Sequence, residues 1–492
     1  MGENIKISIA YPPIESKKGF ASVSQNRQSQ FFHEPQPLQP IVMSWAATML
    51  SKKGYEVYWN DGISEEKSEK KFLEQVVGEN PDYVVIEGKT PVMGNFWTFT
   101  DKIKELLPET RVVFVGDHVT ALPMETFEKS KTDYVVTGGD YDFLLLNLIE
   151  HDSRGVPLEP GIWHKGDGEI KSTGEFQLNH DLDNLPLINR ELTNWRLYAY
   201  KCSLYKTGPG FYIMAGRDCW WHKCTFCSWT TLYPEYRTRS HEKVVDEIGF
   251  LIEEYGAKDI FDDTGSFPTG DWLRRFCRLM IDRGYNKKVR MGCNMRAGSA
   301  THDDFVLMKN AGFRTVLIGL ESANQETLDR INKGLRIEEM VDTYKAMSKA
   351  GLEVHITVMF GYPWETLGDA KRTLELSKYL LRKGIASTVQ ATNVVPYPGT
   401  PLFEYCKRNG LLKTFDWEDY DMSKLVMKAP ISDKDVAKMA QDLYKMAFHP
   451  ELLARKTLKI RSLDDVKFYF KLGKEAFGRI KDFRENDDLN LN

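Results

Sequence analysis

Three cysteines are the residues of this chain whose type and spacing point most directly to chemistry. Cys219, Cys224 and Cys227 follow the pattern C-x4-C-x2-C, so three thiols lie within nine residues. Thiolates this close in sequence bind one soft metal centre, either zinc or an iron–sulfur cluster. His222, inside the same loop, would complete a structural zinc site. A [4Fe–4S] cube held by three cysteines instead leaves one iron open for a substrate or cofactor.

The other four cysteines form no second cluster, and we interpret them as structural. They are Cys202, Cys277, Cys293 and Cys406. The N-terminal sequence lacks the charged-then-apolar layout of a secretory signal, and no run approaches about 18 consecutive apolar residues. We therefore expect reduced thiols in a cytoplasmic protein, with neither a disulfide framework nor a membrane span.

The composition is that of an ordinary globular protein. Of the 492 residues, 42% are hydrophobic and 28% are charged, which excludes disordered, collagen-like and coiled-coil chains. A chain of this length forms roughly two to four domains. The 66 basic and 70 acidic side chains give a net charge of −4, so the overall charge predicts no nucleic-acid partner.

Residues 1–150 alternate short β-type runs, such as DYVVIEG and RVVFVG, with amphipathic segments. This alternation predicts a doubly wound, Rossmann-like α/β domain, in which helices cover a parallel sheet. Ligands of such domains bind beyond the carboxyl ends of the strands, where this sequence has three glycine-containing turns. The turns lie at 88–91, 116–118 and 138–140, and they are either ligand-binding loops or merely tight turns.

Residues 151–205 lose the alternation, and we interpret them as a linker with one hairpin at 166–168. Residues 206–405 form a second α/β series whose helical patterns end at glycines. These are Gly256, Gly284, Gly312, Gly351 and Gly384. With the run at 211–216, the strand-like runs predict six strands, the number of a partial (β/α)6 barrel. Chemistry in such a barrel belongs at the carboxyl ends of the strands.

Residues 406–492 read as helices without strands between them. They contain a basic and apolar stretch at 452–480, LLARKTLKIRSLDDVKFYFKLGKEAFGRI. Such a segment is either a solvated cap with one face on the core or a surface for a membrane or an acidic partner.

The cysteine loop, with Phe226 just before Cys227, resembles the cluster motif of the radical S-adenosylmethionine (SAM) superfamily, and more narrowly of its cobalamin-binding branch. Other barrel segments resemble motifs of the same family: YRTRS with Arg237 and Arg239, FDDTGSF at 261–267, IGLESAN at 318–324, MFGYPWET at 359–366 and VPYPGTPLF at 395–403. The resemblance implies that the three cysteines hold a [4Fe–4S] cluster. It also implies a set of residues around the cluster and SAM: Phe226, Asp262, Asp263, Glu321, Ser322, Gly361 and Glu365. We add Arg296, because arginine binds carboxylates such as that of SAM.

Two N-terminal segments carry the cobalamin part of the resemblance. VFVGDHVTALPME at 113–125 resembles the family's Gly-Gly-Pro-His-x-Thr-Ala-Leu-Pro loop, and DYVVTGGDYDFLLLNL at 133–148 resembles its Gly-Glu-Gly-Glu segment. The residues implied at the cobalamin edge are Thr90, Gly116, His118, Thr120, Gly138 and Gly139.

The sequence departs from the family pattern at three points. Four residues rather than three separate Cys219 from Cys224. The N-terminal region lacks an Asp-x-His-x-x-Gly run, so the resemblance implies cobalamin in a base-off form without a histidine ligand. Gly-Gly-Asp-Tyr-Asp stands in place of Gly-Glu-Gly-Glu, which changes the polar groups at the cobalamin edge.

The resemblance implies a cobalamin-dependent radical SAM enzyme that methylates an unactivated carbon, with no residue assigned to the chemical step itself. The alternative within the branch is a cyclase or rearrangement enzyme resembling the anaerobic magnesium-protoporphyrin monomethyl ester cyclase. A non-catalytic corrinoid or zinc-binding module is the alternative from another class. A methylthiotransferase is disfavoured, because no cysteine precedes Cys202 to hold that family's second cluster.

The expected partners follow from this interpretation. They are a small-molecule or lipid substrate, a one-electron donor such as flavodoxin or ferredoxin, and a membrane surface contacted peripherally by the basic C-terminal helices. The oxygen-sensitive cluster predicts an anaerobic or microaerobic cell.

Overall fold

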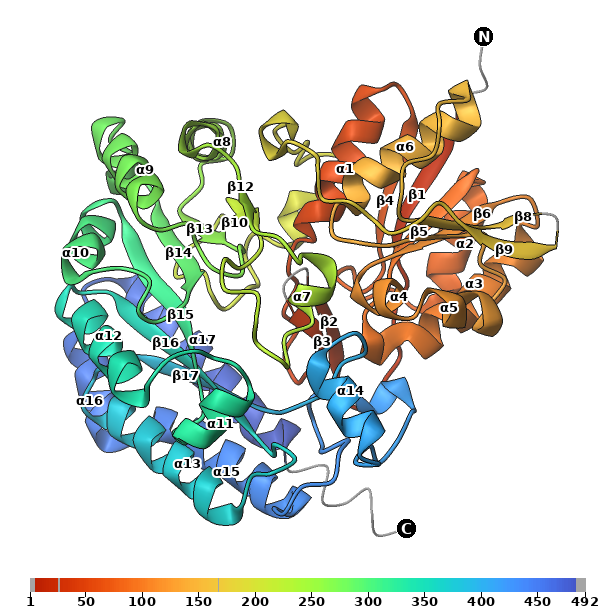
Figure 1. Cartoon of the computed structure of the whole chain (residues 1–492). Helices are drawn as coiled ribbons and strands as arrows, with labels where there is room; N and C mark the ends of the chain where they lie inside the picture. Colours follow the sequence, from red (N-terminus) through yellow and green to blue (C-terminus); the bar gives the residue numbers. More distant parts are fainter. Residues whose placement is uncertain (1–4, 25–26, 167, 484–492) are drawn as a thin grey trace.

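The computed structural model describes residues 5–24, 27–166 and 168–483 of the chain. Two α/β units lie side by side in Figure 1, the N-terminal unit around β1 and β5 and the second unit around β13 to β17. The short helix α7 (Trp229–Leu232) lies between them.

The N-terminal sheet has seven strands in the order β4-β1-β5-β6-β7-β8-β9. The five strands from β4 to β7 in this order are parallel, whereas β8 and β9 are antiparallel. The bounds are β1 (Lys6–Tyr11), β4 (Glu56–Asp61), β5 (Tyr83–Glu87), β6 (Arg111–Val115), β7 (Tyr134–Val136), β8 (Ile162–Gly166) and β9 (Glu169–Ser172). The predicted doubly wound parallel sheet is thus confirmed.

Helices cover both faces of this sheet. In β5, Val85 packs into the core that contains residues of α1 and α6, whereas Val84 and Ile86 pack into the core with α2 and α3. The bounds of these helices are α1 (Ile41–Lys52), α6 (Tyr141–Arg154), α2 (Glu69–Glu79) and α3 (Met93–Leu106). Because both faces are buried, the strand sequence is a continuous apolar run and not an alternating one.

The segment expected to be a linker contributes to the N-terminal sheet. Strand β8 pairs with β7 and with β9, so the hairpin at 166–168 adds two antiparallel strands to the sheet edge. Residue 167, within the expected turn, lies outside the described residues. After β9 the chain forms only turns and the short helices η2 (Leu182–Asn184) and η3 (Trp195–Leu197) before the second unit begins.

The second unit contains a sheet of six parallel strands in the order β10-β13-β14-β15-β16-β17, which confirms the predicted partial barrel. The strands are β10 (Gly210–Ile213), β13 (Asp259–Asp262), β14 (Arg290–Met295), β15 (Phe313–Glu321), β16 (Glu353–Phe360) and β17 (Thr388–Asn393). The intervening helices are α8 (His241–Tyr255), α9 (Asp271–Asp282), α10 (His302–Asn310), α11 (Gln325–Arg330), α12 (Ile337–Lys349) and α13 (Leu367–Arg382). Gly256 caps α8 at φ 64°, the left-handed conformation that glycine adopts without strain.

The interior of the partial barrel is not filled. Along β16 the helix-facing side chains are fully buried, whereas the alternate, interior-facing ones are only half-buried. The interior-facing residues are Glu353, His355, Thr357 and Met359. In a closed small barrel such side chains pack into layers that fill the core, so six strands leave a hollow here.

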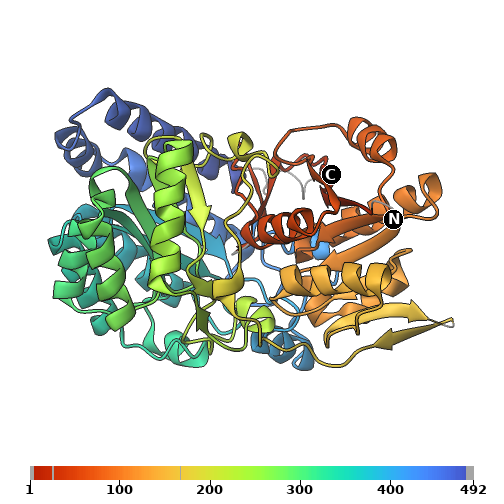
Figure 2. The same ribbon diagram turned by 90° about the horizontal axis from the view of Figure 1, so that it is seen from above.

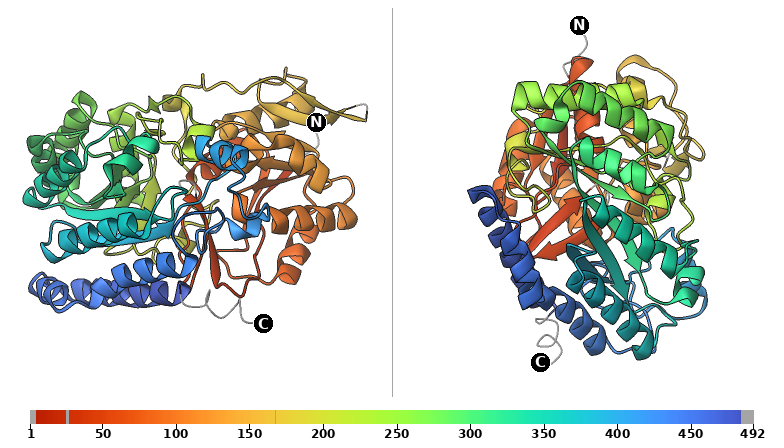
Figure 3. Two further views of the ribbon diagram at one scale, coloured as in Figure 1. Left: turned by 60° about the horizontal axis from the view of Figure 1, so that its bottom comes forward. Right: turned by 90° about the vertical axis from the view of Figure 1, so that its left-hand side faces the viewer.

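The C-terminal region packs against the barrel as helices, as predicted. It comprises α14 (Pro401–Arg408), η5 (Trp417–Asp419), α15 (Asp433–Lys445), η6 (Met446–Phe448), α16 (Pro450–Leu458) and α17 (Leu463–Asp482). Helix α15 packs against α13, β17 and α17, and α17 also contacts β3 (Arg27–Phe32) of the antiparallel hairpin that β3 forms with β2 (Phe20–Ser24). Figures 2 and 3 show α16 and α17 as an outer layer on one side of the barrel. Among the described residues, no helix combines the length and apolarity needed to span a bilayer.

Candidate functional site

The cysteine loop leaves the barrel at the carboxyl end of β10 and is held at its base. Strand β11 (Gly216–Arg217) before the loop pairs with β12 (Arg237–Thr238) after it. Asp262, at the end of β13, accepts hydrogen bonds from the backbone N–H of Ala215 (2.9 Å) and of Thr264 (3.0 Å). Burial raises the pKa of Asp262 to about 7. Asp262 therefore fixes the start of the loop, and Asp263 beside it is buried as well.

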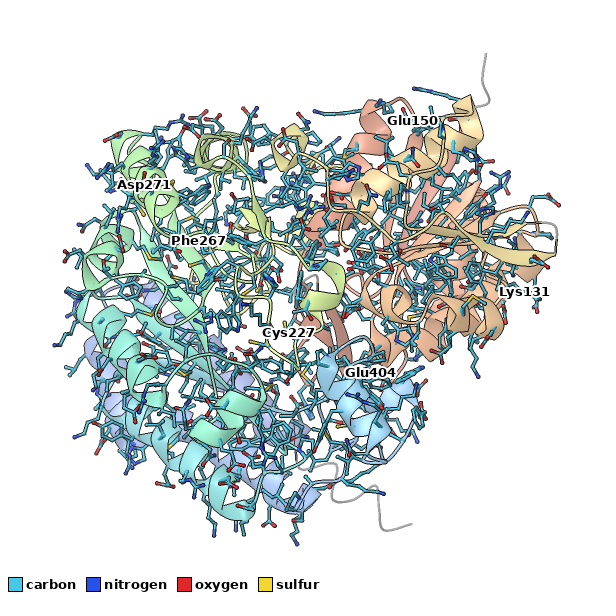
Figure 4. All side chains as sticks on the ribbon, in the orientation of Figure 1. Lys131, Glu150, Cys227, Phe267, Asp271 and Glu404 are labelled. Atoms are coloured by element: carbon cyan, nitrogen blue, oxygen red, sulfur yellow. The ribbon has the colours of Figure 1, made fainter. Side chains whose placement is uncertain are left out.

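The three thiols of the loop are free and share one environment. Burial raises the pKa of Cys224 to about 11, and it raises the pKa values of Cys219 and Cys227 as well. The negative charges of the neighbouring thiolates raise the pKa of Cys227 further. A positively charged cluster core would offset both the burial and the repulsion between thiolates that raise these pKa values, because thiolates bound to metal are deprotonated. The donor set thus fits an iron–sulfur cluster. Figure 4 labels Cys227 between the barrel and the N-terminal unit.

A single zinc ion and a cluster place different demands on the spacing of the cysteines. Tetrahedral zinc with Zn–S bonds of about 2.3 Å requires its sulfur ligands to lie roughly 3.8 Å apart. In the described part of the chain, no three His, Cys, Asp or Glu side chains are grouped to hold a metal ion, and His222 is exposed. A cube binds each thiolate through a different iron, so its cysteines are spaced more widely than those of one ion.

Two tryptophans occupy the four-residue spacing between Cys219 and Cys224. The guanidinium of Arg296 lies 4.1 Å from the ring centroid of Trp221 and 5.2 Å from that of Trp220. Trp221 Nε1 donates a hydrogen bond to the carbonyl of Asn332 (2.8 Å). A Cβ atom on Gly334 would lie 2.2 Å from the Trp221 ring, so only glycine leaves room for this contact. The longer loop is therefore packed against Arg296 just after β14 and against the turn that follows α11.

Arg296 is held by the protein through its two terminal guanidinium nitrogens, while its Nε is buried without a hydrogen-bond partner. Besides the two indole rings, its guanidinium donates to the carbonyls of Lys333 and of Gly334, the latter at 3.1 Å. Burial lowers the pKa of Arg296, and the nearby Cys224 and Cys219 thiols oppose this change. The structure places Arg296 beside the cysteine loop, where it braces that loop.

The carboxyl end of β15 lies next to Cys224. Glu321 has a left-handed φ of 60° and forms an ion pair with Lys333 at 2.8 Å. The charges of Lys333 and Glu321 are the largest influences on the Cys224 thiol after burial. Ser322 is fully buried, and its hydroxyl accepts hydrogen bonds from the Asn324 backbone (3.2 Å) and side chain (3.0 Å). Ser322 thus shapes the turn, whereas Glu321 lies at the cysteine loop.

Gly361 and Glu365 form a separate turn at the end of β16. Glu365 is fully buried, and its Oε2 accepts a hydrogen bond from the Gly361 N–H at 2.6 Å. Burial raises the pKa of Glu365 to about 7. Gly361 has a φ of 91°, and a Cβ atom there would lie 2.2 Å from the side chain of Leu425. Phe226, at the other end of the site, packs half-buried against the barrel core.

The six residues expected at the cobalamin edge gather at the carboxyl ends of β5, β6 and β7. Thr120 Oγ1 accepts from the Gly138 N–H at 3.0 Å, and His118 Nδ1 lies 3.2 Å from Thr90 Oγ1. A Cβ atom on Gly116 would lie 2.6 Å from the Gly88 carbonyl, which explains the glycine there.

His118 is enclosed and not available at the surface of this edge. It is fully buried between the rings of Trp97 and Trp417, at centroid distances of 5.9 and 5.3 Å. Trp417 comes from the C-terminal region, which therefore also covers the N-terminal unit. A histidine enclosed in this way fits cobalamin bound without a histidine ligand, the form that the sequence implies.

The cysteine loop and the cobalamin edge are in direct contact. The Gly139 N–H donates to the carbonyl of Leu232 (3.0 Å), and the Tyr233 hydroxyl donates to the carbonyl of Gly139 (3.0 Å). A Cβ atom on Gly139 would lie 1.9 Å from the Tyr233 ring, so the approach requires glycine. Tyr233 is only six residues beyond Cys227. The expected cluster loop and the expected cobalamin edge thus form one composite site.

A buried ion-pair network joins the two units at this point. The Arg217 guanidinium donates to both carboxylate oxygens of Asp142 (2.9 and 2.5 Å) and to Asp140 (2.9 Å), and all three residues are buried. Arg237 also donates to both oxygens of Asp140. Burial would raise the pKa of Asp140, but the His180 hydrogen bond and the charges of Arg217 and Arg237 hold it well below its ordinary value.

Sequence reasoning missed this network, although one signal for it was present. Asp140 and Asp142 are the two acids of the Gly-Gly-Asp-Tyr-Asp segment that departs from the family pattern. Their carboxylates bind arginines of the barrel and do not face the expected cobalamin site. Of the two arginines in the YRTRS motif, Arg237 joins the network and Arg239 pairs with Glu247 at 2.5 Å.

Comparisons with known proteins agree with the fold. Residues 215–377 match the radical SAM superfamily model, and residues 35–143 match the B12 binding domain model. A methyltransferase of Pyrococcus horikoshii, named as uncharacterized, is 27% identical over 415 residues, or 82% of this chain and 86% of that protein. The anaerobic magnesium-protoporphyrin IX monomethyl ester cyclase of Cereibacter sphaeroides is 27% identical over 79% of this chain and 63% of that protein.

Two solved structures share the whole architecture. The cobalamin-dependent SAM radical enzyme OxsB aligns over 98% of this chain and 72% of its own, with a TM-score of 0.71 and 14% identity. The radical SAM methyltransferase TsrM of Kitasatospora setae aligns over 99% of both chains, with a TM-score of 0.68 and 15% identity. The fold is therefore that of a radical SAM barrel preceded by a B12-binding domain. Residues 215–377 thus carry a radical SAM domain and residues 35–143 a B12-binding domain, and the cofactors of these two domains are SAM, a [4Fe–4S] cluster and cobalamin.

The Arg217 network predicts a large loss of stability when the arginine is removed. Arg217→Ala leaves the buried Asp140 and Asp142 carboxylates without their main partner, so we expect a loss of about 3–5 kcal/mol. Arg275→Ala, which breaks an exposed pair with Asp271, is the matched control and should cost less than about 1 kcal/mol. Urea unfolding of both variants measures the difference. Equal losses of unfolding free energy in the two variants would show that the buried network stabilises the protein no more than an exposed ion pair.

The raised pKa of Glu365 predicts a defined pH dependence. The folded state binds its proton with a pKa of about 7 against 4.5 in the unfolded chain, so this residue favours folding below about pH 4.5 and loses that contribution as the pH rises through 7. Without bound cofactors, Glu365→Gln should therefore exceed the wild type in stability above pH 7 by on the order of 3 kcal/mol, and the gap should shrink towards pH 4.5.

Chemical unfolding of both proteins across this pH range tests the prediction. Glu404→Gln, which removes an exposed carboxylate of α14, serves as the control and should leave the pH profile of the wild type unchanged. If the difference in stability between Glu365→Gln and the wild type does not vary with pH, the raised pKa of Glu365 is contradicted.

Proposed function

We propose that this protein is a cobalamin-dependent radical SAM enzyme that methylates an unactivated carbon. The observation that carries the proposal is the direct contact between the cysteine loop and the B12-binding edge through Gly139, Leu232 and Tyr233. A radical formed at the loop and a methyl group carried at the edge must meet at one substrate carbon, which this contact allows. The methyltransferase name of the Pyrococcus horikoshii relative supports the same function.

The proposed roles of the residues follow their places in the structure. Cys219, Cys224 and Cys227 hold the cluster. The residues proposed around the cluster and SAM are Phe226, Asp262, Asp263, Arg296, Glu321, Ser322, Gly361 and Glu365, and those at the cobalamin edge are Thr90, Gly116, His118, Thr120, Gly138 and Gly139. The bound groups would supply one-electron cleavage of SAM and a transferable methyl group.

The protein itself contributes position and exclusion of water. Asp262 and the β11–β12 pair fix the base of the loop, and Trp220 and Trp221 cover its first half. The network of Arg217 holds the cobalamin edge against the loop. The loop and the N-terminal edge thus bound the site from two sides, and exclusion of water there would protect a reactive carbon radical from side reactions.

A cyclase is the second candidate function. The relatives from Cereibacter sphaeroides and Rubrivivax gelatinosus are both named as anaerobic magnesium-protoporphyrin IX monomethyl ester cyclase. Mass spectrometry of the product separates the two functions, because methylation adds one carbon and cyclisation adds none. A non-catalytic zinc-binding module is disfavoured by the match of residues 215–377 to the radical SAM superfamily model.

We also propose further partners of the activity and a division of the chain into four regions. A small-molecule or lipid substrate, a one-electron donor such as flavodoxin or ferredoxin, and peripheral membrane contact complete the proposed activity. We propose a division into residues 1–150, 151–205, 206–405 and 406–492, with β8 and β9 as additions to the first sheet. The seven free cysteines favour the reducing cytoplasm of an anaerobic or microaerobic cell.

Anaerobic reconstitution of the full chain tests the function. We expect about four irons with matching sulfide per chain, bound cobalamin, and 5′-deoxyadenosine after reduction with dithionite. Cys227→Ala should lose most of the iron and all SAM cleavage, whereas Cys406→Ala, a buried cysteine outside the loop, should retain both. Zinc without sulfide, together with intact SAM, would contradict the proposal.

A further inference from the structure

Helix α17 exposes one continuous stripe along its full length. The exposed positions of this stripe repeat every three or four residues: Leu463, Val466, Lys467, Phe470, Lys474, Phe477 and Lys481. At 100° per residue these seven positions fall within a sector about 100° wide. Leu463 is 78% exposed and Phe470 is 76% exposed, values that large apolar side chains seldom show in a soluble protein.

The chemistry of the stripe is apolar and cationic. Four of its side chains are large and apolar, three are lysines, and the four acidic residues of α17 all fall outside the sector. Leu453 and Leu458 of the adjoining α16 add two more exposed apolar side chains. Among the three lysines, Lys474 forms an exposed pair with Glu34 at 2.8 Å, the kind of pair that contributes little free energy.

This combination fits the surface of an anionic lipid bilayer. Apolar side chains enter the boundary between headgroups and acyl chains, while lysines on the same face extend their ammonium groups to the lipid phosphates. The helix lies in the outer layer of the molecule, as Figure 3 shows, and the side chains of the stripe are exposed. An acidic protein partner would satisfy the lysines but would leave Phe470 and Phe477 without an apolar environment.

A cavity of about 240 Å³ lies directly behind α17. The inner face of α17 lines it with Phe468, Leu472 and Ala476, and Leu443 of α15 and Leu452 of α16 line it from neighbouring helices. Glu475 and Arg479 of α17 line it as well, so the side nearest to the exposed stripe carries both apolar and charged side chains.

The far side of the cavity is the hollow interior of the barrel. Leu317, His355 and Gln390 line it from the interior faces of β15, β16 and β17. Further along β16, Thr357 and Met359 are half-buried on the same face, beyond the residues that line the cavity. The cysteine loop lies at the carboxyl ends of the barrel strands.

Cationic groups also line the cavity on the side of α16. Lys456 and Lys459 both line it, and in the described ranges neither forms an ion pair within 4 Å. The nearby carboxylate of Glu353 is already paired with Arg314 at 2.8 Å. An anionic headgroup would satisfy these lysines, and a hydrocarbon chain would fit between the apolar side chains deeper in the cavity.

We propose that the exposed stripe of α17 docks the protein on an anionic lipid bilayer, and that the cavity behind the helix receives an anionic lipid whose chain reaches into the barrel. In this arrangement the lipid is the acceptor of the transferred group, and only this last step rests on the function proposed above. Docking and lipid binding are properties of the surface and the cavity themselves.

Vesicle sedimentation with the full chain, carrying its cofactors, tests the docking. We expect binding to vesicles that contain phosphatidylglycerol, weaker binding to pure phosphatidylcholine, and loss of binding at high salt. The variant Lys467→Gln/Lys474→Gln/Lys481→Gln should bind roughly fivefold more weakly for each lysine removed, at about 1 kcal/mol per lysine. Phe470→Ser/Phe477→Ser should also lose most of the binding.

Matched controls lie on the N-terminal unit. Lys70→Gln/Lys71→Gln/Lys131→Gln removes three exposed lysines, and Leu106→Ser removes an exposed apolar side chain. Both controls should bind vesicles like the wild type. A wild type that does not sediment with anionic vesicles, or stripe variants that bind as well as the controls, would overturn the docking.

Fluorescence of cis-parinaric acid, an anionic lipid probe, tests the cavity. We expect saturable binding that Ala476→Trp weakens at least tenfold by filling the cavity, while Ala454→Trp, an exposed position on α16, leaves it unchanged. Unchanged vesicle binding by Ala476→Trp shows that this variant is folded. Equal probe binding by both tryptophan variants would overturn the cavity assignment.

Cleavage of SAM, measured in the same preparations, separates this proposal from the proposed function. Vesicle and probe binding without SAM cleavage would contradict the function and leave the lipid site standing. SAM cleavage by a protein that binds neither vesicles nor the probe would overturn the lipid site and leave the function standing.

Discussion

The arrangement of the site depends on the buried pairing of Arg217 with Asp140 and Asp142. Arg217 leads from the first barrel strand into the cysteine loop, and the two aspartates begin helix α6 of the N-terminal unit. Three charges buried at one junction are tolerated only in a geometry that satisfies all of them, so the pairing fixes the angle between the two units. The contact of Gly139 with Tyr233, and with it the composite site, follows from that fixed junction.

Much of this architecture could be predicted because it follows from patterns among residues that are neighbours in sequence. Continuous apolar runs marked the strands buried on both faces, and a left-handed glycine such as Gly256 marked the end of a barrel helix. The positions of the cysteine loop and of the glycine turns at strand ends could be predicted in this way, whereas the cofactors at Cys219 to Cys227 and at Gly116 were implied by the resemblance to a known family. Periodicity and turn chemistry suffice for such features, since they involve neighbours in sequence.

The features that sequence reasoning missed are contacts between distant segments. The pairing of Arg217 with Asp142 joins residues 75 positions apart, and its one signal in the sequence, the two acids at 140 and 142, does not reveal the partner. The stacking of Trp221 on Arg296 depends on how two barrel loops meet. The basic and apolar composition of α17 was visible in the sequence, but only packing decides that Phe468 faces the cavity while Phe470 faces outward.

The central claim is that the cluster and the cobalamin lie together at one junction held by Arg217. Pulsed electron paramagnetic resonance on the reconstituted enzyme, with the cluster reduced and cobalamin in its cobalt(II) form, measures the magnetic coupling between the two centres. We predict strong dipolar coupling in the wild type and a weakened, broadened distribution of couplings in Arg217→Ala. Two magnetically isolated centres in the wild type would contradict the account.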